Sequence, residues 1–183
     1  MVRLRHSVWS ALRLLVVASG LLGARACLAD AGVPKEMVSG EELAVLKAVV
    51  PKICDASCEI RESTLLGTPV DPAVFLGSGT NAPPESMVAD YRRRSAKQLK
   101  IPDGAFSAVR RKPYFPPNEK GRSCQLSRPG IDAEGQRAMV IVKLVESLPK
   151  DVISEGKCVL LQMKDGAWVV ERTVSAWPPM LAH

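Results

Sequence analysis

Apolar residues recur at helical spacing after Ser39, at positions 43, 46, 49, 50 and 53. Ser39 and Glu42 have the spacing of a capping box, in which each side chain accepts a backbone N–H at the start of a helix. Pro51 lacks an N–H, and its ring crowds the carbonyl four residues earlier. We therefore predict a helix that begins after Ser39 and ends or kinks near Val50.

Residues 85–99 show a second helical pattern. The residues predicted to face the core are Met87, Val88, Tyr91, Ser95 and Leu99. Three basic residues then fall on the solvent side, namely Arg93, Arg94 and Lys97. Asp90 and Arg94 are four residues apart in the order that favours a weak ion pair along a helix. Between the two helices, residues 58–66 are predicted to form a strand, and the proline- and glycine-rich residues 67–84 a loop.

The C-terminal third of the chain has the pattern of a sheet. Residues 138–145 are apolar on both faces, as in a central strand. Residues 157–164 and 167–177 flank Asp165-Gly166, a pair that is typical of a tight hairpin turn. This turn sets Lys164 opposite Ala167, Met163 opposite Trp168 and Leu161 opposite Val170. With residues 100–121 expected to be irregular, we predict an α+β fold: an antiparallel sheet of about four to five strands, with a C-terminal β-hairpin, packed by two helices.

The first residues have the order of a secretory signal peptide. Three arginines within residues 1–13 precede an apolar run over residues 14–23, and small residues follow at positions 24, 26, 29 and 31. The apolar run is too short to span a membrane. We expect cleavage after Ala29 or Ala31. With residues 1–29 as the signal peptide, a single domain over residues 30–183 remains, in the periplasm or secreted. Cleavage before Cys27, followed by lipid anchoring, is the alternative.

The charge of the chain is unevenly distributed. Its formal net charge is +6, but residues 1–29 hold four arginines and no acid, so the mature chain would carry +2. Residues 30–91 carry ten acids and four bases, and residues 92–128 carry eleven bases and two acids. The positive charge therefore lies in one middle segment.

Seven basic residues of this segment are the candidate binding residues: Arg92, Arg93, Arg94, Arg110, Arg111, Lys112 and Arg128. For an exported protein we expect the partner to be an acidic protein or an anionic envelope surface, and we expect no nucleic acid. The alternative is a solvated helix face whose basic side chains pair with the acidic first third of the chain.

The histidine count restricts the chemistry. His6 lies in the signal and His183 is the last residue, so catalysis by Ser-His-Asp or Cys-His groups is not expected. Neither a metal site nor a cofactor is predicted, because the cysteines of the mature chain lack the CxxC spacing of zinc and redox sites. Those four cysteines instead predict two disulfides, Cys54–Cys58 and Cys124–Cys158, although the spacing leaves the other two pairings open.

Several stretches resemble a pattern in small exported bacterial proteins of uncharacterised function. In that pattern a Ser-Arg-x-Gly turn, here Ser127-Arg128-Pro129-Gly130, precedes an apolar strand and a Lys-x-Gly-x-Trp hairpin, here Lys164 to Trp168. Residues 42–49 and 88–94 also look similar, whereas Ile131-Asp132 departs from the aromatic-Asn pair of the pattern. The resemblance implies an exported α+β domain and brings no reaction with it.

Two classes of function fit the sequence. The first is an exported non-enzymatic interaction or accessory protein, which the missing histidines, the cysteines and the charge distribution favour. The alternative is a small cone-like α+β ligand-binding domain or enzyme, with a pocket between sheet and helices that would use Asp90, Tyr91 and Arg128.

Overall fold

The computed structural model describes residues 36–54, 58–67, 71–76, 82–106, 111–112, 121–148 and 151–182. The predicted signal peptide, Cys27 and Arg110 lie outside the described residues.

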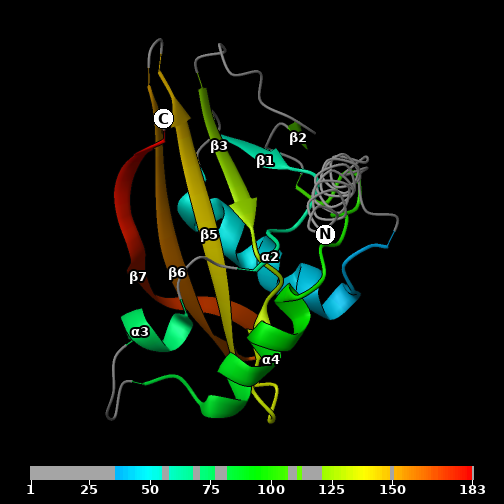
Figure 1. Cartoon of the computed structure of the whole chain (residues 1–183). Coiled ribbons are helices and arrows are strands. Elements are labelled where there is room, and N and C mark those ends of the chain that lie inside the picture. Colours follow the sequence, from blue (N-terminus) through cyan, green and yellow to red (C-terminus); the bar gives the residue numbers. More distant parts are fainter. Residues whose placement is uncertain are drawn as a thin grey trace, which may run out of the picture. The chain divides into compact units, whose positions relative to one another are not determined.

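One mixed sheet organises these residues (Figure 1). Its strands are β1 Cys58–Arg61, β2 Arg111–Lys112, β3 Gly121–Leu126, β4 Gly130–Ile131, β5 Arg137–Ser147, β6 Val152–Lys164 and β7 Ala167–Ala182. The order is β2-β1-β3-β5-β6-β7, and β4 pairs with β5 outside this path. Strands β3, β5, β6 and β7 pair antiparallel, whereas β1 is parallel to both of its neighbours. The predicted α+β class is confirmed, with more strands than expected because β3 and the two-residue strands β2 and β4 were not foreseen.

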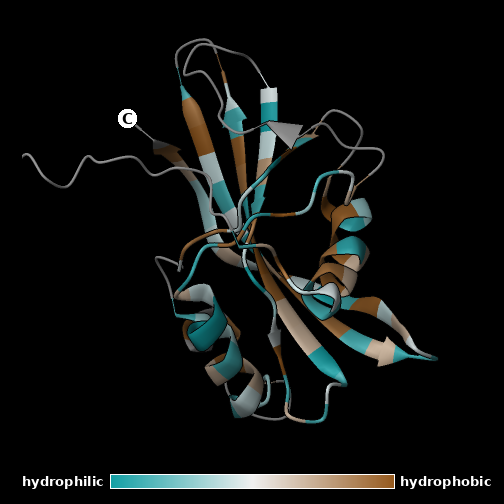
Figure 2. Cartoon of the chain, turned by 90° about the vertical axis from the view of Figure 1, so that its right-hand side faces the viewer, coloured by the Kyte–Doolittle hydropathy of each residue, from teal (hydrophilic) through white to brown (hydrophobic). Residues whose placement is uncertain are grey.

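Helices cover both faces of the sheet (Figure 1). They are α2 Gly40–Ile53, α3 Pro72–Leu76 and α4 Glu85–Ser95. Alternate residues of β5 separate the core into two clusters, because successive side chains of a strand point to opposite faces. Ala138, Val140 and Val142 pack with α2, whereas Met139 and Ile141 pack with α3 and α4. Figure 2 shows hydrophobic and hydrophilic residues mixed along the helices, as expected for helices with one buried side.

Helix α2 has the predicted capping box. Glu42 N–H donates to the Ser39 hydroxyl, and Ser39 N–H donates to the Glu42 carboxylate. Of the two predicted effects of Pro51, an end near Val50 does not occur, because the helix continues to Ile53 with Pro51 in its last turn. Pro51 is exposed. On the solvent side of a helix the carbonyl that loses its N–H partner can tilt toward water, which makes the proline tolerable.

Helix α4 presents the predicted buried side. Met87, Val88, Tyr91 and Ser95 are buried, and Leu99 is buried beyond the helix end at Ser95. The stretch predicted to be a loop contains the short helix α3, whose Leu76 packs in the same cluster as α4. None of the described helices is long and apolar enough to cross a membrane.

The C-terminal hairpin has the predicted register. Lys164 lies opposite Ala167, Met163 opposite Trp168, and Leu161 opposite Val170. Asp165 and Gly166 both have positive φ, 51° and 77°, as the tight turn requires. The two strands extend further than predicted, to Val152 and to Ala182.

Candidate functional site

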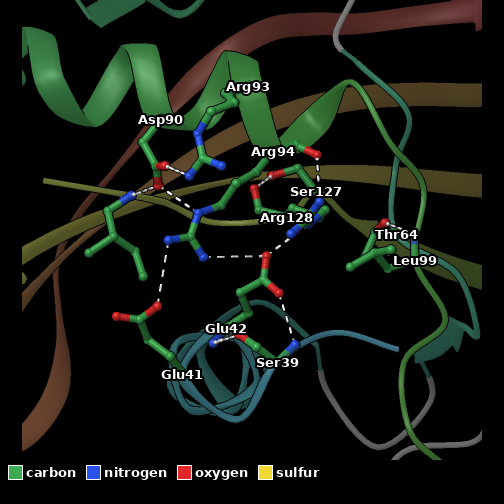
Figure 3. Close-up of polar contacts among 11 residues, drawn as sticks. Ser39, Glu41, Glu42, Thr64, Asp90, Arg93, Arg94, Leu99, Ser127 and Arg128 are labelled. Carbon is green, nitrogen blue, oxygen red and sulfur yellow. Dashed lines mark hydrogen bonds and ion pairs between the residues drawn. The ribbon is translucent and has the colours of Figure 1, made fainter. Parts of the chain in front are cut away.

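A buried glutamate connects α2 with the rest of the molecule (Figure 3). The Glu42 side chain in the first turn of α2 is 1% exposed. Its Oε1 accepts a hydrogen bond from Arg128 Nε at 2.8 Å, and Arg94 Nη1 lies 3.6 Å from the same oxygen. Its Oε2 accepts the Ser39 N–H at 2.9 Å. One carboxylate therefore caps a helix and contacts two guanidinium groups from other elements.

Arg94 extends this network to α4. Its Nε lies 2.7 Å from Asp90 Oδ2, and its Nη2 lies 3.5 Å from Glu41 Oε2. Asp90 Oδ2 also accepts the backbone N–H of Ile131 at 3.0 Å. The predicted Asp90–Arg94 pair is confirmed, but the placement of Arg94 on the solvent side is wrong, because its side chain is only 17% exposed. It points toward α2, where the two glutamates attract it.

The turn between β3 and β4 supplies the third side of the network. Arg128 Nη1 donates to the Arg94 carbonyl at 3.0 Å, in addition to its bond with Glu42. Ser127 Oγ accepts the Ile141 N–H and donates to the Arg128 carbonyl, both at 2.9 Å. A Cβ on Gly130 would lie 2.4 Å from the Met87 carbonyl oxygen, so this position packs directly on the backbone of α4. Each of these three residues of the Ser-Arg-x-Gly turn thus has a structural contact.

Two acids of the network, Glu42 and Asp90, are held in their charged form. Burial of Glu42 raises its pKa, but the Arg128 hydrogen bond, the Ser39 N–H and the charges of Arg128 and Arg94 outweigh burial and lower the pKa below 4.5. Burial likewise raises the pKa of Asp90, and the Ile131 N–H and the two neighbouring arginines bring it below 3.8. The network is therefore an array of opposite charges at neutral pH.

The other candidate basic residues of α4 are exposed and have partners. Arg92 donates to both oxygens of Asp71, at 2.8 and 2.6 Å, and Arg93 pairs with Asp90. Lys97, one turn further, pairs with Glu36 at 2.6 Å. All three of these acids belong to the acidic segment 30–91, as the local-pairing alternative expects. Arg111 and Lys112 form strand β2 beside β1, and their side chains lie outside the described residues.

A hollow of about 410 Å³ adjoins the network. Its lining includes Glu41, Asp90, Arg94, Asp132 and Glu134. The charged groups at its base, Asp90 and Arg94, already contact each other. Tyr91, the remaining candidate for a pocket site, is 2% exposed beneath Gly130. This arrangement fixes α2, α4 and the β3–β4 turn to one another.

The cysteines are distributed differently from the predicted disulfides. Cys54, Cys58 and Cys124 lie together, with their Sγ atoms within 4.8 Å of one another. The Sγ atoms of Cys54 and Cys58 are 3.1 Å apart, longer than a disulfide bond of about 2.05 Å, so the predicted Cys54–Cys58 pair is not at bonding distance in this structure. The predicted Cys124–Cys158 pair is not formed, because Cys158 faces the α4 side of the sheet and Cys124 the α2 side.

Cys124 and Cys158 are held in the protonated form. Hydrogen bonding with Cys54 and Cys58, together with burial, raises the pKa of Cys124 well above 9.0. Burial raises the pKa of Cys158 to about 12 against the opposing charge of Arg172. Sequence spacing did not reveal the cluster of three, because its third member comes from the parallel pairing of β1 with β3.

Comparison with known proteins adds no assignment. No protein-family model, curated protein or solved structure matches this chain. The resemblance to small exported bacterial proteins therefore stays a prediction. It is notable that the similar stretches around residues 42–49, 88–94 and 127–130 supply Glu42, Arg94 and Arg128, which meet in the network.

Proposed function

We propose that the protein is an exported, non-enzymatic accessory protein that binds an acidic partner. The binding surface, called the basic side of α4, consists of Arg92 and Arg93 in the helix and Lys97 just beyond its end at Ser95. One observation carries the proposal: the basic residues in and near α4 and in the β3–β4 turn fall into two groups. Arg94 and Arg128, each 17% exposed, are held in structural ion pairs, whereas the three side chains of the basic side are each more than half exposed.

The basic side of α4 can exchange its partners. The side chains of Arg92, Arg93 and Lys97 are 54%, 71% and 57% exposed, and each pairs with a carboxylate of the same chain. Exposed ion pairs contribute roughly 0–1 kcal/mol, because water competes with them and two side chains must be ordered. Carboxylates of a partner can therefore replace the internal ones at little cost.

The helix that carries these charges is rigidly held. Met87 and Tyr91 of α4 are buried in the core cluster against the sheet. Arg94 ties the helix to α2 through Glu41 and Glu42. A surface that is ordered before binding loses less conformational entropy on association. The pocket alternative is less favoured, since Asp90 and Arg128 are engaged in the network and Tyr91 is buried.

Export predicts a shortened chain. In protein isolated from its natural host, we expect residues 1–29 or 1–31 to be missing, so that the chain starts at Asp30 or Gly32. Intact mass measurement and fractionation of the cells check this. A lipid-modified chain that begins at Cys27 would retain export but exclude the soluble form. A full-length chain in the cytoplasm would contradict the proposal.

Neutralising the basic side should weaken binding. For the triple variant Arg92→Gln, Arg93→Gln and Lys97→Gln we expect about tenfold weaker retention of the partner at low salt, since three exposed charges at about 0.5 kcal/mol each sum to that ratio. Purified protein would be immobilised and exposed to a host envelope extract and, separately, to vesicles containing anionic lipid. Binding of the unaltered protein should also fall as salt is raised.

A matched control removes the same charge elsewhere. Lys47, Lys52 and Lys164 are exposed and lie on α2 and on β6. Their replacement by Gln should leave binding unchanged. Retention by an extracted protein identifies an acidic partner, whereas retention only by the vesicles identifies an anionic surface. Equal losses in the two triple variants would show that net charge alone matters, which would refute the basic side as a specific surface.

A further inference from the structure

Three sulfur atoms from separate elements converge on the α2 side of the sheet. Cys54 is the C-cap of α2, Cys58 begins β1, and Cys124 lies in β3. The parallel register sets Ile60 beside Cys124, so Cys58 and Cys124 lie on the same face of adjoining strands. All three side chains are buried, and the three sulfur atoms lie within 4.8 Å of one another.

The spacing of the sulfur atoms suits a metal ion with three sulfur ligands. With metal–sulfur bonds of about 2.3 Å, a planar three-sulfur site has sulfur atoms about 4 Å apart. This value lies between the 3.1 Å that separates Cys54 from Cys58 and the 4.8 Å that bounds the cluster. Small rotations of the side chains would therefore make the triangle regular.

The number and type of ligands distinguish between metals. Thiolates select soft ions such as Cu(I) and Zn(II). Structural Zn(II) sites have four protein ligands, and catalytic Zn(II) sites add a water to three. Within the described residues the cluster comprises three ligands, all sulfur, and all three are buried away from water. Cu(I) accepts three sulfur ligands without a fourth group.

We propose that Cys54, Cys58 and Cys124 form a binding site for one Cu(I) ion. Each thiol that coordinates releases its proton to solvent, so Cu(I) on three thiolates carries a net charge of −2. Arg122 lies in register with Cys58, which places a positive charge on the side of the site nearest solvent. This site is independent of the proposed binding surface, because α4 covers the opposite face of the sheet.

A hollow supplies access for the ion. Its volume is about 240 Å³, and Cys58 and Arg122 contribute to its lining. Glu146 and Glu155 line the same hollow and can attract a cation from solution. Cys58 lines this hollow and Cys54 and Cys124 do not, so Cys58 is the ligand that an arriving ion meets first.

Copper binding can be measured directly. Protein expressed from the complete gene with Cys27→Ser would be purified without oxygen and titrated with Cu(I) against the coloured chelator bicinchoninate. We expect one Cu(I) per chain, and X-ray absorption of the copper should give three sulfur neighbours. Cys58→Ser and Cys124→Ser should each weaken binding by about 100-fold or more, because loss of a direct ligand exceeds the effect of a lost outer contact.

Cys158→Ser is the matched control. Cys158 is also fully buried, but it lies in the cluster on the α4 side of the sheet, so its loss should leave the affinity for Cu(I) unchanged. The number of sulfur neighbours that X-ray absorption gives for copper bound to the protein with all three cysteines tests the site even if a serine variant fails to fold. Fewer than three sulfur neighbours, or equal affinities in the Cys124 and Cys158 variants, would overturn the proposal. So would a Cys54–Cys58 disulfide in protein isolated from its host, since it leaves a single thiol in the cluster.

Discussion

Glu42→Gln should lower the free energy of unfolding by about 3 kcal/mol at pH 7, as is typical when one partner of a buried ion pair is removed. Glutamine keeps the size of the side chain but leaves Arg94 and Arg128, both 17% exposed, without their common anion. Urea unfolding followed by circular dichroism measures the effect. Glu41→Gln is the matched control, because it removes the same charge from a neighbouring, 56% exposed side chain and should cost less than about 1 kcal/mol.

The pH dependence provides a second readout of the same substitution. A carboxyl group whose pKa is lowered on folding stabilises the native state above its unfolded pKa, and this contribution is lost as the pH falls through the folded pKa. For Glu42 the loss begins near its ordinary value of 4.5, and for Asp90 near 3.8. The unaltered protein should therefore lose stability on acidification below about pH 4.5, and Glu42→Gln should lose less. Parallel pH profiles for the two proteins would contradict the assigned role of Glu42.

The features that the sequence predicted well are local ones. The capping box of Ser39 and Glu42 and the buried side of α4 depend on residues within one or two turns of helix. The hairpin register depends on the Asp165-Gly166 turn, whose backbone conformation sets the pairing of the two strands. These patterns are complete within a short segment, so periodicity and turn chemistry are sufficient to recognise them.

The features that the sequence did not predict depend on contacts between distant segments. Helical periodicity assigns Arg94 to the solvent side, but it cannot show that α2 brings two glutamates over that side. The Ser-Arg-x-Gly turn was recognised only as a pattern, and the contacts of Arg128 and Gly130 give it a physical reason. The three-cysteine cluster likewise depends on the β1–β3 register, which spacing along the chain does not contain.

The close packing of Gly130 against α4 leads to the second large expected effect. A Cβ at this position would lie 2.4 Å from both the Met87 carbonyl oxygen and Tyr91 Cβ, and 2.8 Å from Tyr91 Cα. Two of these three atoms belong to the helix backbone, so the conflict is relieved only if α4 moves away from the sheet. For Gly130→Ala we expect a loss of about 3 kcal/mol, at the upper end of the cost of overpacking a core. Thermal and urea unfolding measure it.

The control for this substitution is Gly40→Ala, where the added Cβ would meet nothing within 4 Å at the start of α2. Alanine is favoured over glycine in helices, so this variant should be as stable as the unaltered protein or more so. If Gly130 holds α4 in place, Gly130→Ala also draws Arg94 away from Glu42. The double variant with Glu42→Gln should then lose less stability than the two single variants combined. If the loss of stability in the double variant equals the sum of the two single losses, the turn and the ion-pair network act separately. Both would otherwise depend on the same position of α4, and the first substitution would already have removed part of what the second removes.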